Sequence, residues 1–346
     1  MLKETEAGLY SGAMTRDELV RLEKRPKTKM EILLDYIVCL LPVGAGCAAL
    51  WEYLCFPNLP GNESGLYYRC FLTALIALSA LAFVTTLLSG KAFEWLRYHA
   101  PFYTFVFFLL GAYDWLTLKT GKLPLPYFPW VDQVIQAAWE DREYLLDCTR
   151  NSLYLLFTGY FTGVAAGLVT GISCGCSKKV NYWIEPFTRL LGAIPSTTWL
   201  PVVLVLASSL FKGSVFIIAL GVWYSVTISS ITGIVNIDYA YFEAAKTLGV
   251  RGWGLVTHIA VPSALPSILA GMTQGMSTAC TALLVAEMIG VESGLSWYIS
   301  WQKNWARYGN MYAALVMICI VFVLVNVVLS AIRRYALRWQ EEGGLR

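Results

Sequence analysis

Charged residues are scarce in this chain. Lys, Arg, Asp and Glu make up 14% of its 346 residues, whereas 57% are hydrophobic and the mean hydropathy is +0.56. Soluble globular domains carry about 25% charged residues. The net charge of +3 is too small to indicate a protein that binds nucleic acid. The composition therefore predicts a membrane protein with no nucleic-acid partner.

Residues that build catalytic and nucleotide-binding sites are also few. The chain has two histidines, and no stretch fits the G-x-x-x-x-G-K-[ST] phosphate loop, so any ATP hydrolysis must occur on another chain. Cys174 and Cys176 lack the second pair of ligands that a zinc site needs. The sequence offers neither a metal-ligand cluster nor a nucleophile–base pair. We therefore expect no catalytic residue, no metal and no cofactor on this chain.

Long apolar stretches fill most of the sequence. A helix that crosses a bilayer needs about 20 mostly apolar residues, and eight windows meet this condition: 33–56, 70–89, 101–118, 152–173, 186–208, 214–236, 263–288 and 311–332. The first 30 residues are polar and include acidic groups, so we expect neither a cleaved signal nor a transit peptide. The sequence predicts an all-α, polytopic membrane protein with about eight transmembrane helices.

Basic residues cluster in alternate loops. Lys and Arg in short loops stay on the cytoplasmic side of a membrane. Five clusters share one face: residues 21–29, 91–97, 178–179, 246–251 and 333–338. We therefore expect both termini in the cytoplasm. Cys55 and Cys70 then lie near the outer ends of the first two spans, where a disulfide fits as well as two free thiols; we favour free thiols.

Two prolines interrupt the window 186–208. Pro195 and Pro201 bracket a polar stretch, and broken helices at membrane depth are tolerated only where the freed backbone is buried in protein or faces water. We expect this segment to line a pathway with polar residues of later spans. The candidates are Ser196, Thr197, Thr198, Trp199, Ser225, Thr227, Thr273, Gln274, Ser277, Thr278, Thr281 and Glu287. Because Ser and Thr in spans often bond only to their own backbone, Gln274 is the best single candidate.

Glycines recur at every fourth position in the window 152–173. Gly159, Gly163, Gly167 and Gly171 share one helix face, and small residues at this spacing let two membrane helices approach closely. Two interpretations fit this pattern. One is simple dense packing, which we favour, and the other is a helix that slides on its neighbour.

A short polar segment separates the windows 214–236 and 263–288. It reads Glu243-Ala244-Ala245-Lys246-Thr247-Leu248-Gly249, and Ile259 and Pro262 follow it. Alanine favours a helix, and Gly249 can take the left-handed conformation that ends it. Pro262 suits the first turn of the next span, and we expect Glu243 near the helix start, where the dipole favours an acid. The segment predicts a short, stiff helix that contacts a soluble partner.

This spacing resembles the EAA loop of permeases in ATP-binding-cassette importers, with Val261 in place of the usual Leu. From about Leu109 to Trp339 the chain is similar to permeases of the nitrate/sulfonate/taurine/bicarbonate group. The motifs that carry the similarity are Leu123-Pro124-Leu125-Pro126, Ile194-Pro195 with Trp199-Leu200-Pro201, the loop 238–262, and Ala286-Glu287-Met288-Ile289-Gly290 followed by Ser293-Gly294-Leu295. The chain departs from the group in its extra hairpin within residues 1–100 and in Leu206–Phe211, which lacks a W-F-G-like run.

The resemblance implies a type I importer permease in a bacterial cytoplasmic membrane. Residues 101–340 would form a six-helix core, and residues 1–100 a polar leader and an accessory two-helix hairpin. The implied partners are a second permease subunit, expected to be a copy of this chain, two ATPase subunits that bind ATP and Mg, and an extracytoplasmic binding protein that delivers a small polar or anionic solute. The implied coupling residues are Glu243, Ala244, Ala245, Gly249, Ile259 and Pro262.

Two other functions stay open at this point. An ion-coupled secondary transporter would need carboxylates or histidines near mid-membrane, but the acidic residues of the spans lie near span ends and neither histidine is mid-span. A membrane scaffold or enzyme without transport is the remaining alternative.

Overall fold

The computed structural model describes residues 29–338, so the polar leader and the end of the C-terminal tail lie outside the described residues. Every regular element within this range is a helix. The chain forms two compact units, one ending at Leu123 and the other beginning at Pro124. Within residues 29–338, seven helices are long and apolar enough to cross a membrane, and a sharply bent pair makes an eighth. The predicted all-α, multi-span fold is confirmed.

The first unit contains three spanning helices. They are α2 (Lys29–Cys55), α3 (Leu66–Leu88) and α4 (Gly90–Asp114), and α4 continues into the π-helical turn η1 (Trp115–Lys119). Gly46 of α2 lies where the three helices meet, because an added Cβ would be 2.7 Å from Ile76 Cγ1 on α3 and 3.1 Å from Phe107 Cε1 on α4. At the end of α2 the buried Lys119 ammonium donates to the Tyr53 carbonyl at 3.0 Å. The three helices are therefore in close contact with one another, and the Lys119 hydrogen bond joins the end of η1 to the end of α2.

The third span belongs to this unit, which corrects the boundary expected at residue 100. Ser89 alone separates α3 from α4, so the expected loop at 89–100 is the first part of α4. Arg97 is accommodated there because its guanidinium pairs with the buried Asp35 of α2 at 2.5 Å. Since α4 packs against α2 and α3, residues 29–123 contain three spans, and residues 124–338 contain five where six were expected.

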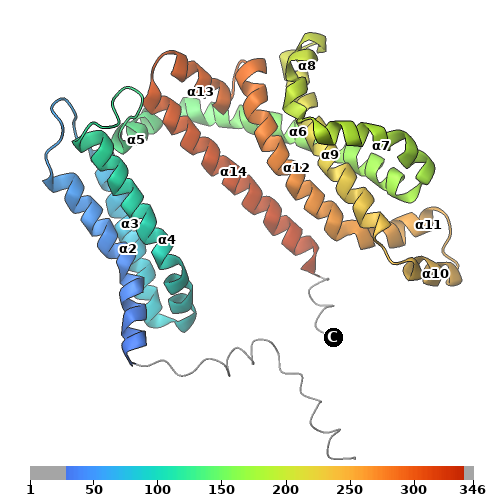
Figure 1. The fold of residues 1–346 in the computed structure, drawn as a ribbon, viewed down its shortest axis with the longest axis horizontal. Coiled ribbons are helices and arrows are strands. Elements are labelled where there is room, and N and C mark those ends of the chain that lie inside the picture. The colour runs from blue at the N-terminus through green and yellow to red at the C-terminus, as the bar shows by residue number, and fades with distance from the viewer. Residues whose placement is uncertain (1–28, 339–346) are drawn as a thin grey trace, which may run out of the picture. The chain divides into compact units, whose positions relative to one another are not determined.

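The second unit contains the remaining helices, drawn from green to red in Figure 1. They are α5 (Val131–Glu140), α6 (Arg142–Cys176), α7 (Lys178–Ala193), η2 (Ser196–Trp199), α8 (Leu200–Leu206), α9 (Leu210–Val235), α10 (Tyr239–Thr247), α11 (Trp253–Leu255), η3 (Val256–Ala260), α12 (Val261–Gly290), α13 (Leu295–Asn304) and α14 (Tyr308–Ala336). Five spans result: α6, the bent pair of α7 with η2 and α8, α9, the continuous helix through α12, and α14. Hydropathy does not predict α13, which is ten residues long and mixes apolar with polar residues.

Helix α9 is the centre of the second unit and packs against both α6 and α12. The glycine-lined face of α6 faces it: a Cβ added at Gly163 would lie 2.6 Å from the Ala219 carbonyl oxygen, and one at Gly171 would lie 2.9 Å from the Thr227 carbonyl oxygen. On the other side, an added Cβ at Gly275 of α12 would lie 3.2 Å from Val222 Cγ1. The prediction of dense packing is confirmed, whereas sliding stays a hypothesis.

Candidate functional site

The span at 178–206 is broken as its prolines predict. Helix α7 ends at Ala193, and the helical segment Ser196–Leu206 leaves it at an angle of 93°. Ile194 is extended (φ −116°, ψ 120°) because the ring of a following proline disfavours the helical conformation. Pro195 is also non-helical (φ −55°, ψ 138°), and η2 begins at the next residue. The break thus leaves two residues of non-helical backbone inside an apolar span.

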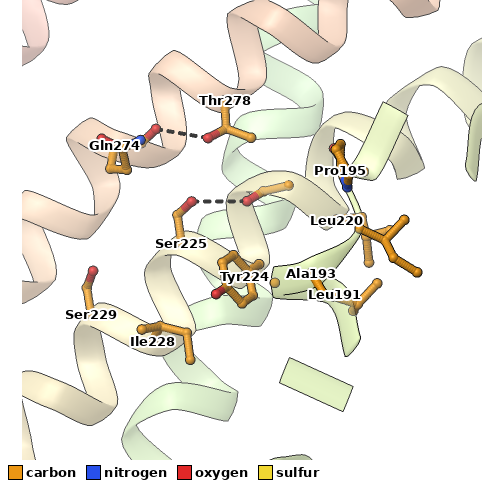
Figure 2. A pocket seen from close by; sticks show the side chains of 14 residues that line it. Leu191, Ala193, Pro195, Leu220, Tyr224, Ser225, Ile228, Ser229, Gln274 and Thr278 are labelled. Carbon is orange, nitrogen blue, oxygen red and sulfur yellow. Dashed lines mark hydrogen bonds between the residues drawn. The ribbon is translucent and has the colours of Figure 1, made fainter. Parts of the chain in front are cut away.

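A cavity of about 410 Å³ lies beside this break. Figure 2 shows its side chains coming from three places: the end of α7 and the break, helix α9, and helix α12. The residues that line it are Leu191, Gly192, Ala193, Ile194, Pro195, Ser196, Leu220, Gly221, Tyr224, Ser225, Ile228, Ser229, Gln274 and Thr278. The freed backbone at Ile194 and Pro195 therefore faces a cavity, which is the condition under which a membrane protein tolerates a broken helix.

The polar groups of the cavity fall into two classes. The Ser225 hydroxyl donates to the Gly221 carbonyl at 3.2 Å, and the Thr278 hydroxyl donates to the Gln274 carbonyl at 3.2 Å; Figure 2 draws both bonds. Among the described residues, no partner engages the hydroxyls of Ser196, Tyr224 and Ser229 or the side-chain amide of Gln274. The groups of the second class can therefore donate to a solute without breaking a hydrogen bond to a helix carbonyl.

The cavity is lined without formal charge. None of its described lining residues is Lys, Arg, Asp or Glu, and the polar groups are hydroxyls and one amide. The rest of the wall is aliphatic or proline. Such a lining can form hydrogen bonds with a solute, but it cannot neutralise the charge of an ionic solute.

The structure brings together some of the predicted pathway residues and separates others. Ser196, Ser225, Gln274 and Thr278 line the cavity. The candidates outside its lining are Thr197, Thr198, Trp199, Thr227, Thr273, Ser277, Thr281 and Glu287. Of these, Thr273 and Thr281 donate to carbonyls of their own helix, at 2.9 and 3.1 Å. The helix-bonded interpretation therefore holds for these two residues.

Sequence reasoning missed Tyr224 and Ser229 of α9. An added Cβ at Gly192 would overlap the Tyr224 phenol, so the ring lies directly against the chain at the end of α7. Aromatic residues are common in apolar spans, and nothing near Tyr224 in the sequence distinguishes it. A usable signal was available for Ser229, because Ser225 and Ser229 are four residues apart and share a helix face.

Glu287 lies outside the lining of this cavity. Its side chain is completely buried, and its Oε2 accepts a hydrogen bond from the Ser296 N–H at 2.9 Å. The Ser152 hydroxyl accepts from the adjacent Leu295 N–H at 2.9 Å. Free N–H groups at a helix start need such acceptors, so Glu287 fixes the beginning of α13 to the end of α12.

A hydrogen-bond network at the base of α13 surrounds Asp141, just before α6. The Tyr298 hydroxyl and the Asn310 amide both donate to Asp141 Oδ2, at 2.5 and 2.7 Å. Burial and the neighbouring Asp141 carboxylate raise the pKa of Tyr298 well above its usual value. The tyrosine therefore stays protonated and keeps donating over the physiological pH range.

The loop 238–262, the coupling loop that the resemblance implies, contains the predicted helix and its predicted stop. Asp238 caps α10 by accepting from the Ala240 N–H at 3.0 Å. After the helix, Gly249 has φ +86°; its N–H donates to the Lys246 carbonyl and the Val250 N–H to the Ala245 carbonyl, both at 3.0 Å. These two bonds form a Schellman motif, whose left-handed position glycine occupies most easily.

Two details of this loop differ from expectation. Glu243 is the fifth residue of α10 and is exposed, so it lies in mid-helix and not at the start. Pro262 does lie in the first turn of α12, but the π-helical turn η3 (Val256–Ala260), which contains Ile259, precedes it without a break. Pro262 has no N–H to donate to the His258 carbonyl, which disturbs the regular bonding of this turn.

The loop is anchored on one side only. Ala245 is buried, and Phe242 packs with Ile234 and Ala260, which belong to a small core between α9 and α12. The opposite side of the loop is exposed, including Glu243 and Ala244. The helix is therefore fixed to two spanning helices while presenting a free face.

Comparison with known families matches residues 163–341 to the binding-protein-dependent transport system inner membrane components. This range is just over half of the chain and includes the broken span, the cavity and the coupling loop. The chain belongs to this family. It is a multi-pass membrane protein of a transport family and not of an enzyme family.

Relatives of this inner membrane component agree with the assignment. A Methanocaldococcus jannaschii protein named as an ABC transporter permease is 28% identical over 120 residues, 35% of this chain and 45% of the relative. The Bacillus subtilis protein SsuC, named as a permease for aliphatic sulfonates, is 26% identical over 113 residues, 33% of this chain and 41% of the relative. The chain thus spans less than half the length of these two relatives.

A solved structure shares the fold. A chain in the crystal structure of an amino acid ABC transporter with histidines superposes with a TM-score of 0.50 at 18% identity, covering 59% of this inner membrane component and 97% of that chain. The family match begins at residue 163, later than the resemblance expected from about Leu109, and the three-span N-terminal unit lies outside it.

Proposed function

We propose that this chain is the permease subunit of an ATP-driven importer and that the cavity at the broken span is part of its translocation pathway. The observation that carries the proposal is the uncharged, hydrogen-bonding cavity at a proline-broken span. A polar group inside a membrane is costly unless it forms a hydrogen bond with a solute or with another protein group. Several polar side chains of the cavity have no such partner among the described residues.

The motor is a separate ATPase subunit that contacts the coupling loop. The chain has no phosphate loop, so it needs partners that bind ATP and Mg. The loop that contains Glu243 also exposes the large side chains of Tyr241, Leu248 and Trp253, by 63%, 83% and 79%. Large exposed apolar side chains on a polar loop favour a protein partner. The basic residues of this loop favour the cytoplasmic side, with both termini on that side.

The complete transporter contains two copies of this permease, two ATPase subunits and an extracytoplasmic binding protein. The uncharged cavity supports a small polar or anionic solute, and the similarity to a permease named for aliphatic sulfonates supports an organic acid. The unit ending at Leu123 is an accessory part, because it lies outside the family match. Its removal lowers the yield or partner binding more than it changes solute choice.

Reconstitution of the purified complex in vesicles tests the proposal. With the binding protein outside and ATP inside, a labelled solute accumulates, and the accumulation stops when ATP is replaced by a non-hydrolysable analogue. Accumulation driven by an ion gradient without ATP would instead establish a secondary transporter. A complex that binds ATP but accumulates no solute offered with its binding protein would refute the permease assignment.

A further inference from the structure

Tyr224 and Gln274 carry the longest side chains among the cavity donors that have no partner within the described residues. Tyr224 comes from α9 and Gln274 from α12, as Figure 2 shows. We propose that Tyr224 and Gln274 contact the solute and determine specificity, and that the cavity accepts a small organic solute with an apolar body and a hydrogen-bond-accepting head, not an inorganic oxyanion. This inference rests on the proposed function and names the chemistry of its site.

Hydrogen bonding and side-chain length together single out these two residues. The hydroxyls of Ser196 and Ser229 also have no partner among the described residues, but they are held close to the backbone by a short side chain. The hydroxyls of Ser225 and Thr278 are held by carbonyls of their own helices at 3.2 Å, so binding a solute would break or share an existing bond. Within the described part of the chain, neither the Tyr224 hydroxyl nor the Gln274 amide has such a bond. Both groups can donate to a sulfonate or carboxylate oxygen. Their neutral character keeps the interaction weak enough for release, which a transport site requires.

The apolar wall selects against a compact inorganic anion. An ion that leaves water needs charged partners or many hydrogen bonds to offset its lost hydration, and the described lining residues carry no charge. The wall beside the donors is aliphatic: Leu220 and Ile228 lie one turn to either side of Tyr224 on the same face of α9, and Leu191 comes from the end of α7. An alkyl or aryl body gains from contact with this wall, by about fourfold in affinity for each buried methylene at about 0.8 kcal/mol.

The size of the cavity agrees with this selection. A volume of about 410 Å³ lies within the range of about 300–1,000 Å³ seen for small-molecule sites. A nitrate or bicarbonate ion displaces only a few waters of about 30 Å³ each. Gly192 and Gly221 allow lining side chains to pack closely: an added Cβ at Gly221 would lie 2.8 Å from Thr278 Cγ2 and 2.9 Å from Ser196 Oγ, so a larger residue there would displace both side chains.

Protection of an engineered cysteine measures occupancy of the cavity directly. The full-length permease carries Ser229→Cys in the complex with its ATPase, and its five exposed cysteines are replaced by alanine. These are Cys47, Cys55, Cys70, Cys176 and Cys319. A water-soluble methanethiosulfonate reagent labels the new thiol, and the labelling rate is followed with increasing hexanesulfonate, propanesulfonate or nitrate.

We expect hexanesulfonate to slow labelling at lower concentration than propanesulfonate, and nitrate to have no effect at the same ionic strength. Tyr224→Phe and Gln274→Leu each raise the half-protecting concentration about threefold to tenfold, as loss of one neutral hydrogen bond predicts. Matched controls leave it unchanged. Thr273→Val removes a hydroxyl beside Gln274 that is bonded to the Leu269 carbonyl, and Tyr182→Phe removes an exposed phenol of α7 outside the cavity.

Three results would overturn the inference: equal protection by nitrate and hexanesulfonate, half-protecting concentrations in the Tyr224 and Gln274 variants equal to the parent, or no labelling of the new thiol under any condition. Tyr224→Phe keeps the ring and its packing, so a shift in that variant is not a folding defect if its labelling rate without solute matches the parent. Vesicle uptake with the same preparation separates the two proposals, because failure of the transport function abolishes uptake but leaves the protection pattern intact.

Discussion

The contact between α6 and α9 makes a sharp prediction at Gly163. A Cβ added there would lie 2.6 Å from the Ala219 carbonyl oxygen and 2.7 Å from Val222 Cβ. Carbon atoms in contact prefer about 3.5–4.0 Å, so Gly163→Ala forces the two helices apart by about 1 Å. Because one of the obstructing atoms is backbone, a rotamer change cannot relieve the overlap. Overpacking of this kind costs about 1–3 kcal/mol.

The matched control is Gly44→Ala in α2, where an added Cβ meets nothing within 4 Å. Both substitutions gain the same helix propensity of about 1 kcal/mol, so the difference between them isolates the packing cost. We expect Gly163→Ala to be less stable than Gly44→Ala by about 1–3 kcal/mol when the full-length protein is unfolded by denaturant in mixed micelles. Equal stability of the two variants would show that α6 and α9 do not pack through this glycine.

Four further predictions follow from the second unit. Gly249→Val places a β-branched residue at φ +86°, which costs about 1–3 kcal/mol of local strain. We expect this variant to insert in the membrane but to show lower ATP-driven uptake and weaker ATPase association. Full uptake with normal recovery of the complex would contradict this prediction. Ser196→Cys reacts with a water-soluble thiol reagent at a rate that changes on ATP-state trapping, whereas Thr198→Cys, outside the cavity lining, shows no such change; equal behaviour of the two would argue against the pathway. Glu287→Leu leaves the buried Ser296 N–H without its acceptor and destabilises the protein by about 1–3 kcal/mol, and Glu287→Gln, which keeps an acceptor, loses less in a thermal unfolding assay. Tyr298 binds its proton more tightly when folded, so stability falls as pH rises above the ordinary tyrosine value of about 10, and Tyr298→Phe removes that part of the pH dependence.

Hydropathy predicts the spans of this chain but not how they are grouped. The segment 90–100 looked like a loop because it contains Lys91, Arg97 and His99. Helix formation does not require apolar residues, and the charge of Arg97 is matched by Asp35. That pairing joins residues 62 positions apart, which no local pattern reveals. The boundary between the two units was misplaced for this reason.

The helix α13 was missed for a related reason. Its start is held by the Glu287 carboxylate, and its base by the Tyr298–Asp141 bond. Both interactions are tertiary, whereas the sequence of α13 is mixed and short. Glu287 was correctly recognised as unusual in a span, but its role depends on a partner nine residues later in the chain.

The cavity shows which parts of a site can be predicted from sequence. Prolines and an amide in an apolar span are locally anomalous, and they identified the break, Ser196 and Gln274. Tyr224 is not anomalous, because a phenol ring fits any apolar span. It lines the cavity next to Gly192, at the end of α7, where the chain turns away. The missing information was thus the position of the break relative to α9.

Helix α9 explains how a membrane span with scattered hydroxyl residues contributes to a polar site. One of its faces receives the glycines of α6 and another those of α12, so two neighbours hold it by close backbone contact. The break between α7 and η2 leaves part of its remaining surface facing the cavity, and Tyr224, Ser225 and Ser229 lie there. Rigid packing on two sides fixes these groups, while the broken span opposite is the element with fewer helical bonds. A stroke of the coupling loop, which packs against the ends of α9 and α12, would therefore change the cavity by moving the helices between which it lies.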